Sequence, residues 1–210
     1  MSRRRVDNLL GLAVLSVLFS RPMHPYEIAR ELRVRGKDED MEIKWGSFYT
    51  VVRNLEKHGL IEARASSRQG ARPERTVYGI TGAGREELED WTRELIAVPR
   101  PERPSFKAGL SVLGGLGPDE AATLLERRLL ALQTRIAGQQ ASLERDRQQV
   151  PRLFLIESEY DLTLLEAEAA WIRGLLQELR DGSFPGLEEW RAFLGHADDV
   201  DGAEAGRPMA

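Results

Sequence analysis

The chain has 210 residues, of which 41% are hydrophobic and 30% charged, a composition typical of a soluble globular protein. It contains no cysteine, which excludes a disulfide framework, a thiolate metal site and a cysteine nucleophile. The formal net charge of −4 conceals an asymmetry. Residues 1–80 hold 15 Lys and Arg against 10 Asp and Glu, a balance of +5, so the remainder carries 15 against 24, a balance of −9. Only the N-terminal part is therefore expected to approach a polyanion.

The first predicted element is an apolar helix over residues 6–19. Three arginines precede it, as basic residues precede a secretory signal, but Asp7 and Asn8 interrupt the approach and no small-residue cleavage site follows. The stretch is also much shorter than the roughly 20 residues that cross a bilayer. We therefore expect a buried first helix in a cytoplasmic protein that has no membrane partner.

Two further short helices are expected next. His24 can cap the second helix, with Pro25 at its first position, where the missing N–H costs nothing. The third helix is predicted to begin with Ser47 as its N-cap and to end near His58, before Gly59. Its buried face is expected to comprise Phe48, Val51, Val52 and Leu55. Its opposite face would then carry polar, basic and aromatic side chains, namely Tyr49, Thr50, Arg53, Asn54 and Lys57.

A β-hairpin and a fourth helix follow. Residues 60–65 and 75–80 are strand-like runs, and the basic, glycine-containing segment 66–74 between them predicts a long hairpin tip. Thr81 is expected to cap the fourth helix, which runs to about Ala97. The buried stripe of this helix is predicted to be Leu88, Trp91 and Leu95. This order of elements predicts a winged helix-turn-helix domain whose wing is the two-stranded β-hairpin.

The domain boundary is predicted from proline content. Residues 98–104 contain three prolines in seven positions, which prevents helix and strand alike. We interpret them as a linker between a DNA-binding domain of residues 1–97 and an all-α dimerisation or effector domain of residues 105–195. Residues 196–210 are small, acidic and glycine-containing, which predicts a disordered tail. The chain as a whole is expected to be mainly α.

The all-α domain is predicted to pair with a second copy. A short helix over 106–113 precedes two long helices, the first starting at Pro118 and the second covering about 153–179. One stripe of the last helix runs through Tyr160, Leu164, Ala167, Trp171 and Leu175, and another through Leu162, Leu165, Ile172, Leu176 and Leu179. A helix that is apolar on two sides has two neighbours, one of which we assign to a second subunit. The candidate dimer residues are Leu125, Leu129, Leu132, Ile136, Trp171 and Leu175.

The polar face of the third helix and the hairpin tip form the candidate DNA-binding surface. A helix fits the major groove, where Arg and Asn reach base edges, while hairpin arginines grip phosphate or enter the minor groove. Either feature alone is more often a solvated surface. Together with the charge asymmetry they favour DNA binding. A winged helix that binds a protein partner instead, with the acidic C-terminal half as an adaptor surface, is the alternative.

Three blocks of sequence carry a family resemblance. They are HPYEI at 24–28, GSFYTVVRNLEKHGLI at 46–61 and RTVYGITGAGR at 75–85. In this order and spacing they resemble the PadR family of transcription regulators over residues 6–97. The C-terminal half resembles the helical dimerisation region that longer members share with a virulence-activator subgroup. Two positions depart from the family, which usually has Gly where Pro25 stands and Pro where Thr50 stands.

The resemblance implies a function as well as a fold. A homodimer would bind double-stranded DNA at an inverted repeat, with its recognition helices about one turn of DNA apart. Repression is the usual outcome in the family, and many members release DNA when a small aromatic effector binds near the junction of the two domains. Tyr26, Ser47, Tyr49 and Arg53 would lie at or near the DNA. The full set of candidate DNA-binding residues is Tyr26, Lys44, Ser47, Tyr49, Thr50, Arg53, Asn54, Arg68, Arg72 and Arg75.

Effector binding and catalysis have weaker support. Aromatic residues that either line an effector pocket or belong to the core are Trp45, Trp91, Phe106, Tyr160 and Trp171. The three histidines, His24, His58 and His196, have no partners at metal-ligand spacing, and no phosphate loop, nucleophile elbow or zinc motif occurs. We therefore expect no catalytic residue, no metal and no cofactor, and we rank an enzyme last.

Overall fold

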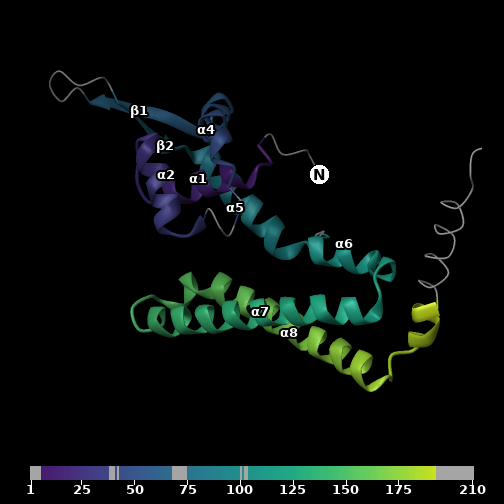
Figure 1. Ribbon diagram of the computed structural model, residues 1–210. Helices are drawn as coiled ribbons and strands as arrows, with labels where there is room; N and C mark the ends of the chain where they lie inside the picture. The colour runs from purple at the N-terminus through teal and green to yellow at the C-terminus, as the bar shows by residue number, and fades with distance from the viewer. Residues whose placement is uncertain are drawn as a thin grey trace, which may run out of the picture. The chain divides into compact units, whose positions relative to one another are not determined.

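The computed structural model describes residues 6–37, 41, 43–67, 75–99, 101 and 104–192, without the side chains at 65–67 and 75. The chain divides into two compact units, Met1–Pro101 and Glu102–Ala210 (Figure 1). We call them the first and the second unit. The predicted fold class is confirmed, because the chain is mainly helical and carries a two-stranded hairpin in its first unit.

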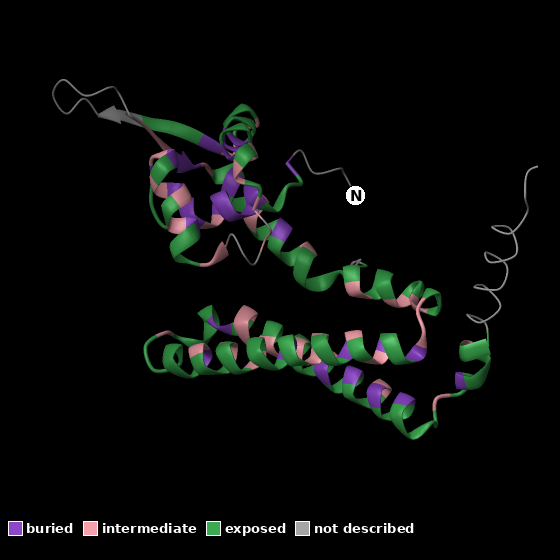
Figure 2. Ribbon diagram, viewed as in Figure 1, coloured by how far each residue is buried: buried purple, intermediate pink, exposed green. Residues whose placement is uncertain are grey.

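The first unit is built around helix α1, Leu9–Leu18. The side chain of Asn8 caps it by accepting a hydrogen bond from the Leu10 N–H at 2.9 Å. Eight of its ten residues are buried, so neighbours cover it on several sides, as its uniformly apolar sequence predicted (Figure 2). Among the described residues, no helix is long and apolar enough to cross a membrane.

Helices α2, Pro25–Val34, and α4, Phe48–Lys57, pack on α1. The predicted cap of α2 is confirmed: His24 Nδ1 accepts a hydrogen bond from the Tyr26 N–H at 3.1 Å. The Glu27 side chain completes a capping box by accepting a hydrogen bond from the His24 N–H at 2.9 Å. The connection from α4 to the hairpin turns at Gly59, whose φ of 70° favours glycine.

The wing consists of β1, Ile61–Ser67, and β2, Arg75–Ile80, which pair antiparallel with Ile61 opposite Ile80. A register shift between Ala63 and Ala65 marks an irregularity in β1. Beside β2, Met23 and Tyr78 exchange two backbone hydrogen bonds of 2.9 Å, so the segment before α2 extends the sheet by one residue.

Helix α5, Gly82–Ala97, completes the first unit. The prediction that Thr81 caps it is confirmed, because the Thr81 hydroxyl accepts a hydrogen bond from the Gly84 N–H at 3.0 Å. Trp91 is buried as expected. The predicted stripe is wrong at Leu95, which is 36% exposed, because the last turns of α5 extend past the core of the first unit.

The second unit contains α6, Ser105–Ser111, then α7, Pro118–Asp146, and α8, Ile156–Asp181. Short turns, η2 at Leu113–Gly115 and η3 at Arg152–Phe154, join them, and residues 187–192 are helical. Helices α7 and α8 lie side by side as an antiparallel hairpin (Figure 1). Their shared core contains Leu125, Leu132, Ala169, Ile172, Leu176 and Leu179. The predicted tail, 196–210, lies outside the described residues.

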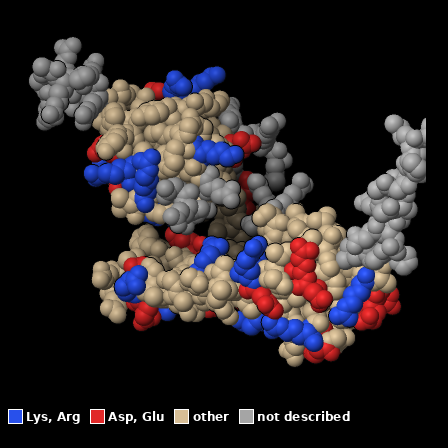
Figure 3. All heavy atoms as spheres, in the orientation of Figure 1, with Lys and Arg blue, Asp and Glu red and all other residues tan. Residues whose placement is uncertain are grey.

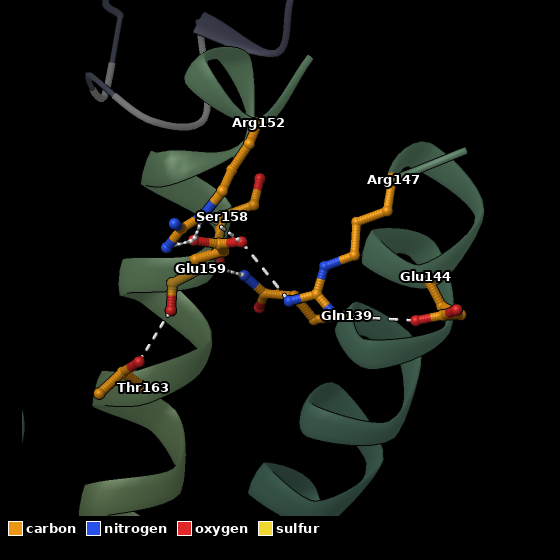
Figure 4. A network of polar contacts seen from close by, with 7 residues as sticks. All are labelled: Gln139, Glu144, Arg147, Arg152, Ser158, Glu159 and Thr163. Atoms are coloured by element: carbon orange, nitrogen blue, oxygen red, sulfur yellow. Dashed lines mark hydrogen bonds and ion pairs between the residues drawn. The ribbon is translucent and has the colours of Figure 1, made fainter. Parts of the chain in front are cut away.

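A polar network closes the end of this hairpin (Figure 4). Arg152 donates to Glu159 with its Nη2 at 3.0 Å, and Arg147 approaches the same carboxylate at 3.5 Å. Gln139 of α7 donates to the backbone carbonyl of Ser158 on α8 at 3.1 Å. The hydrogen bond from Arg152 holds the pKa of the Glu159 carboxyl below its ordinary value, and Arg147 adds to the effect.

Candidate nucleic-acid interface

Helix α4 divides cleanly into two faces. Phe48, Val51, Val52 and Leu55 are buried in the core of the first unit, which confirms the predicted inward face. The opposite face is open to solvent and holds Tyr49, 62% exposed, together with Thr50, Arg53 and Asn54. Because the buried face fixes the rotation of the helix, these four side chains all lie on its outer surface. They are available to a partner that approaches the helix from outside.

Helix α4 starts where it was predicted to start, with Ser47 at its N-cap position, but the Ser47 side chain does not make the capping hydrogen bond. A 3-10 turn, η1 at Trp45–Ser47, leads into the helix. The Ser47 hydroxyl does not cap α4 but donates to the carbonyl of Lys44 at 2.8 Å. A serine hydroxyl can accept or donate, and the tight turn places the Lys44 carbonyl within its reach. Lys44 itself is exposed just before the turn.

Trp45 anchors this turn to the rest of the first unit. The Arg33 guanidinium lies over its ring, 3.9 Å from the centroid, and the ring of Phe48 is 5.9 Å away. Trp45 is half-buried and packs against the core. The structure thus places it beneath the start of α4 as a packing residue, one of the two roles that its sequence position allowed.

The wing is tied to α4 by a side-chain contact that the sequence reading missed. Tyr78 of β2 donates its hydroxyl to Glu56 of α4 at 3.2 Å. Burial raises the pKa of the Tyr78 phenol, and the Glu56 carboxylate raises it further. The contact joins residues 22 positions apart, so no local pattern indicates it. It holds the base of the wing beside the exposed helix.

The remaining predicted DNA-binding residues are distributed over the first unit. Tyr26, in the first turn of α2, is 68% exposed. Arg75 opens β2, whereas Arg68 and Arg72 lie outside the described residues. Figure 3 shows Lys and Arg side chains in separate groups on the visible face of the first unit, with Asp and Glu side chains beside some of them and uncharged surface between the groups. Such a surface contacts a polyanion at discrete points rather than along one continuous basic stripe.

The predicted dimer residues mostly pack inside a single chain. Leu125 and Leu132 are each 4% exposed in the core between α7 and α8, so little of either side chain is left for a partner. Leu129, Ile136 and Leu175 are half-buried against the same core. Trp171 differs, because it remains 50% exposed. A heptad-like stripe does not by itself reveal whether the second helix belongs to the same chain.

The candidate effector aromatics do not form one cluster within either unit. Trp91 is buried in the first unit. In the second unit Phe106 and Trp171 meet edge to face with centroids 6.1 Å apart, and Tyr160 is 59% exposed. Among the described residues, no group of three His, Asp or Glu side chains is placed to hold a metal ion.

Three helices around a common core, with an exposed third helix beside a hairpin, define a winged helix-turn-helix protein. Residues 14–90 match the model of the transcriptional regulator PadR-like family. The negative transcriptional regulator PadR of Bacillus subtilis (strain 168) is 24% identical over 137 residues, which cover 65% of this chain and 74% of that protein. The N-terminal region of the chain is therefore similar to the PadR-like family of transcriptional regulators.

Solved structures extend the likeness beyond the winged helix. Bacillus subtilis PadR in complex with operator DNA matches with a TM-score of 0.68 at 21% identity, covering 81% of this chain and 99% of that chain. The structure of the same protein in complex with p-coumaric acid matches with a TM-score of 0.67 at 19% identity, covering 82% of this chain and 99% of that chain. The structure of the Vibrio cholerae virulence activator AphA matches with a TM-score of 0.59 at 21% identity, covering 82% of this chain and 98% of that chain. The fold likeness therefore includes helices of the second unit, and these neighbours are transcriptional regulators rather than enzymes.

Proposed function

We propose that the protein is a dimeric repressor that binds an inverted-repeat operator through α4 and the wing, and that a small aromatic effector releases it. The observation that carries the proposal is the division of α4 into a buried apolar face and an exposed face with Tyr49, Thr50, Arg53 and Asn54. A helix presented in this way fits the major groove. The PadR fold seen in complex with operator DNA supports this orientation.

Each exposed residue receives a role from its chemistry. Arg53 and Asn54 would reach base edges, since Arg recognises guanine and Asn recognises adenine by paired hydrogen bonds. Lys44, Ser47, Tyr49 and Tyr26 would contact phosphates around the start of α4. The wing arginines Arg68, Arg72 and Arg75 would lie on the backbone or in the minor groove.

Thr50 gives this chain its own recognition chemistry. It is the third residue of α4, where the backbone N–H has no partner within the helix. The proline usual at this position would offer neither that N–H nor a hydroxyl. An additional donor pair on the face turned to DNA would change the preferred operator sequence.

The dimer surface is best assigned to the uncovered stripe of α8. Tyr160, Leu164 and Trp171 lie along this helix and are 59%, 47% and 50% exposed. The other stripe of α8, with Ile172, Leu176 and Leu179, is already covered by the core. A second copy that covers the open stripe would hold two α4 helices at the spacing of an inverted repeat.

The support for repression, and for release of DNA by an effector, comes from the relatives of this chain. The Bacillus subtilis relative is a negative regulator, and its structures contain operator DNA or p-coumaric acid. A repressor that senses a small acid would act in the cytoplasm, where its operator lies. We propose that this chain also represses transcription and releases its operator when an effector binds, although its effector can differ from that of the relative.

Selection of bound sequences from random double-stranded DNA tests the proposal. The expected result is an inverted repeat whose half-sites are centred about 10 base pairs apart. On the selected DNA, Arg53→Ala should weaken binding about tenfold to a hundredfold, through the loss of base contacts. Arg173→Ala, which removes an exposed arginine of α8, is the matched control and should bind like the wild type. Arg72→Ala should lower the slope of affinity against salt by about one unit.

The protein-adaptor alternative makes the opposite prediction. A winged helix that binds only proteins is not retained on random DNA at low salt. Such a result, or equal operator affinity of Arg53→Ala and the wild type, would overturn the proposal.

A further inference from the structure

The wing meets α4 through two side chains, Tyr78 and Glu56, neither of which belongs to the predicted DNA-binding residues. The Tyr78 hydroxyl donates to Glu56 Oε2 at 3.2 Å. Only one of the two partners is anchored, because the Tyr78 ring is half-buried against the core of the first unit whereas Glu56 is exposed. The tyrosine is therefore the fixed partner, and its position decides where the Glu56 carboxylate lies.

The backbone of Tyr78 is held from two sides. It lies opposite Ala63 in the ladder of β1 and β2, and on its other edge it exchanges two hydrogen bonds of 2.9 Å with Met23. Burial raises the pKa of the Tyr78 phenol, and the Glu56 carboxylate raises it further, so the hydroxyl remains a donor at neutral pH. A fixed backbone and a packed ring make this hydroxyl a rigid hydrogen-bond donor.

Helix α4 itself offers Glu56 another partner. Residues three or four positions apart are neighbours on the surface of a helix. Of the four residues at these distances from Glu56 along the chain, only Arg53 is charged. In the part of α4 and its surroundings that the structure describes, Arg53 has no ion-pair partner, while Tyr78 holds Glu56 on the side of the wing. The hydroxyl of Tyr78 and the guanidinium of Arg53 are thus alternative partners of one carboxylate.

We propose that Tyr78 is a positioning residue for operator recognition: its hydroxyl holds the Glu56 carboxylate at the base of the wing and so keeps Arg53 free for the DNA bases. A guanidinium that is paired with a carboxylate cannot offer the same two N–H groups to guanine. A carboxylate released from Tyr78 would also lie closer to the DNA phosphates, which repel it. The inference rests on the proposed function, and it adds two residues that act on recognition without needing to touch DNA.

A double-mutant cycle on the full chain tests the role of the hydroxyl. Tyr78→Phe keeps the packed ring, and its affinity for the selected operator should fall about threefold to tenfold, the worth of one hydrogen bond. In the background of Glu56→Gln the same substitution should change affinity by less than about twofold, because glutamine forms no ion pair with Arg53. Comparing the two backgrounds cancels the general effect of removing a negative charge near DNA.

Glu86→Gln is the matched control, because it removes the same charge from an exposed position of α5 in the first unit. In that background Tyr78→Phe should lose as much affinity as it does in the wild type. Base preference is a second readout that a purely structural role would not move. Arg53→Ala should relax the preference at one base pair of each half-site, and Tyr78→Phe should relax it at the same base pair. Circular dichroism verifies that the variants are folded.

The exchange of partners can also be measured without DNA. In NMR spectra of the full chain, the Nε–H resonance of Arg53 should shift on Tyr78→Phe, and the shift should vanish when Glu56→Gln is also present. An unchanged resonance would overturn the exchange of partners.

The operator measurements decide the role in recognition. Equal affinity of Tyr78→Phe and the wild type, or an equal loss with and without Glu56→Gln, would overturn this inference alone, since the wild type still binds DNA in both cases. A wild type that is not retained on DNA at low salt would overturn the proposed function, and the recognition role of Tyr78 with it.

Discussion

Helix α1 of the first unit and helix α8 of the second unit differ in how completely the rest of the chain covers them. In the first unit, eight of the ten residues of α1 are buried, and the helices around it close a single core. In the second unit, only Ala169, Ile172, Leu176 and Leu179 are buried among the 26 residues of α8. Large apolar side chains elsewhere on α8 stay exposed. Helix α1 is thus covered on nearly all sides by its own chain, whereas α8 keeps an apolar stripe open, and this stripe is the surface that we propose for the dimer.

The largest effect on stability is expected in the core of the first unit. Leu15→Ala removes a fully buried side chain of α1 and should lower the free energy of unfolding by about 3 kcal/mol. Leu9→Ala in the same helix, where the side chain is 40% exposed, should cost about 1 kcal/mol or less. Urea denaturation followed by circular dichroism measures both. Equal losses would show that α1 is not the centre of a closed core.

The open stripe of the second unit should matter for assembly rather than for the stability of one chain. Trp171→Glu places a charge in the proposed dimer surface and should yield monomers in light scattering. Operator affinity should then fall about a hundredfold or more, because the two half-sites are no longer bound by one linked molecule. Gln177→Glu adds the same charge at another exposed position of α8 and should remain dimeric. A monomeric wild-type protein would refute the dimer altogether.

Close packing in the first unit also makes a single methyl group costly. A Cβ at Gly84 of α5 would collide with the backbone carbonyl of Leu60 and lie 2.9 Å from Ile80 Cγ1. Gly84→Ala should therefore destabilise the protein by about 1–3 kcal/mol. Gly82→Ala, two residues earlier, meets open space and should be neutral or stabilising by about 0.5 kcal/mol. If the two variants unfold at the same urea concentration, α5 does not pack against the Leu60 backbone.

Local signals in the sequence predicted the first unit well. The caps at His24 and Thr81 and the turn at Gly59 each depend on a few neighbouring residues, and all three predictions are confirmed. Ser47 shows the limit of such signals. Serine is a residue type that often caps helices, and Ser47 occupies the N-cap position. Its hydroxyl nevertheless donates to the Lys44 carbonyl, because the preceding 3-10 turn brings that carbonyl close.

Contacts between distant residues were not predictable in the same way. The pair Glu56 and Tyr78 is separated by 22 positions, and Arg33 reaches Trp45 from another helix. The stripe with Leu125 and Leu132 indicated a partner helix, which the structure supplies as α8 of the same chain. Periodicity reports that a face is covered and leaves open which helix covers it.

The smallest predicted effect lies at the closed end of the second unit, where polar rather than apolar contacts join α7 and α8. Arg152 lowers the pKa of Glu159, with a contribution from Arg147. A carboxyl whose pKa is lowered on folding stabilises the protein fully above the ordinary glutamate pKa of about 4.3, and this contribution is lost as the pH falls through the lowered value. The wild type should therefore lose more stability between pH 7 and pH 3 than Glu159→Gln does, in urea denaturation at both pH values. Glu120→Gln, an exposed residue of α7 without an ion-pair partner in the described part of the chain, should lose as much as the wild type. An equal loss in all three proteins would mean that the hairpin end gains nothing from its arginines, and that its geometry depends on the apolar core alone.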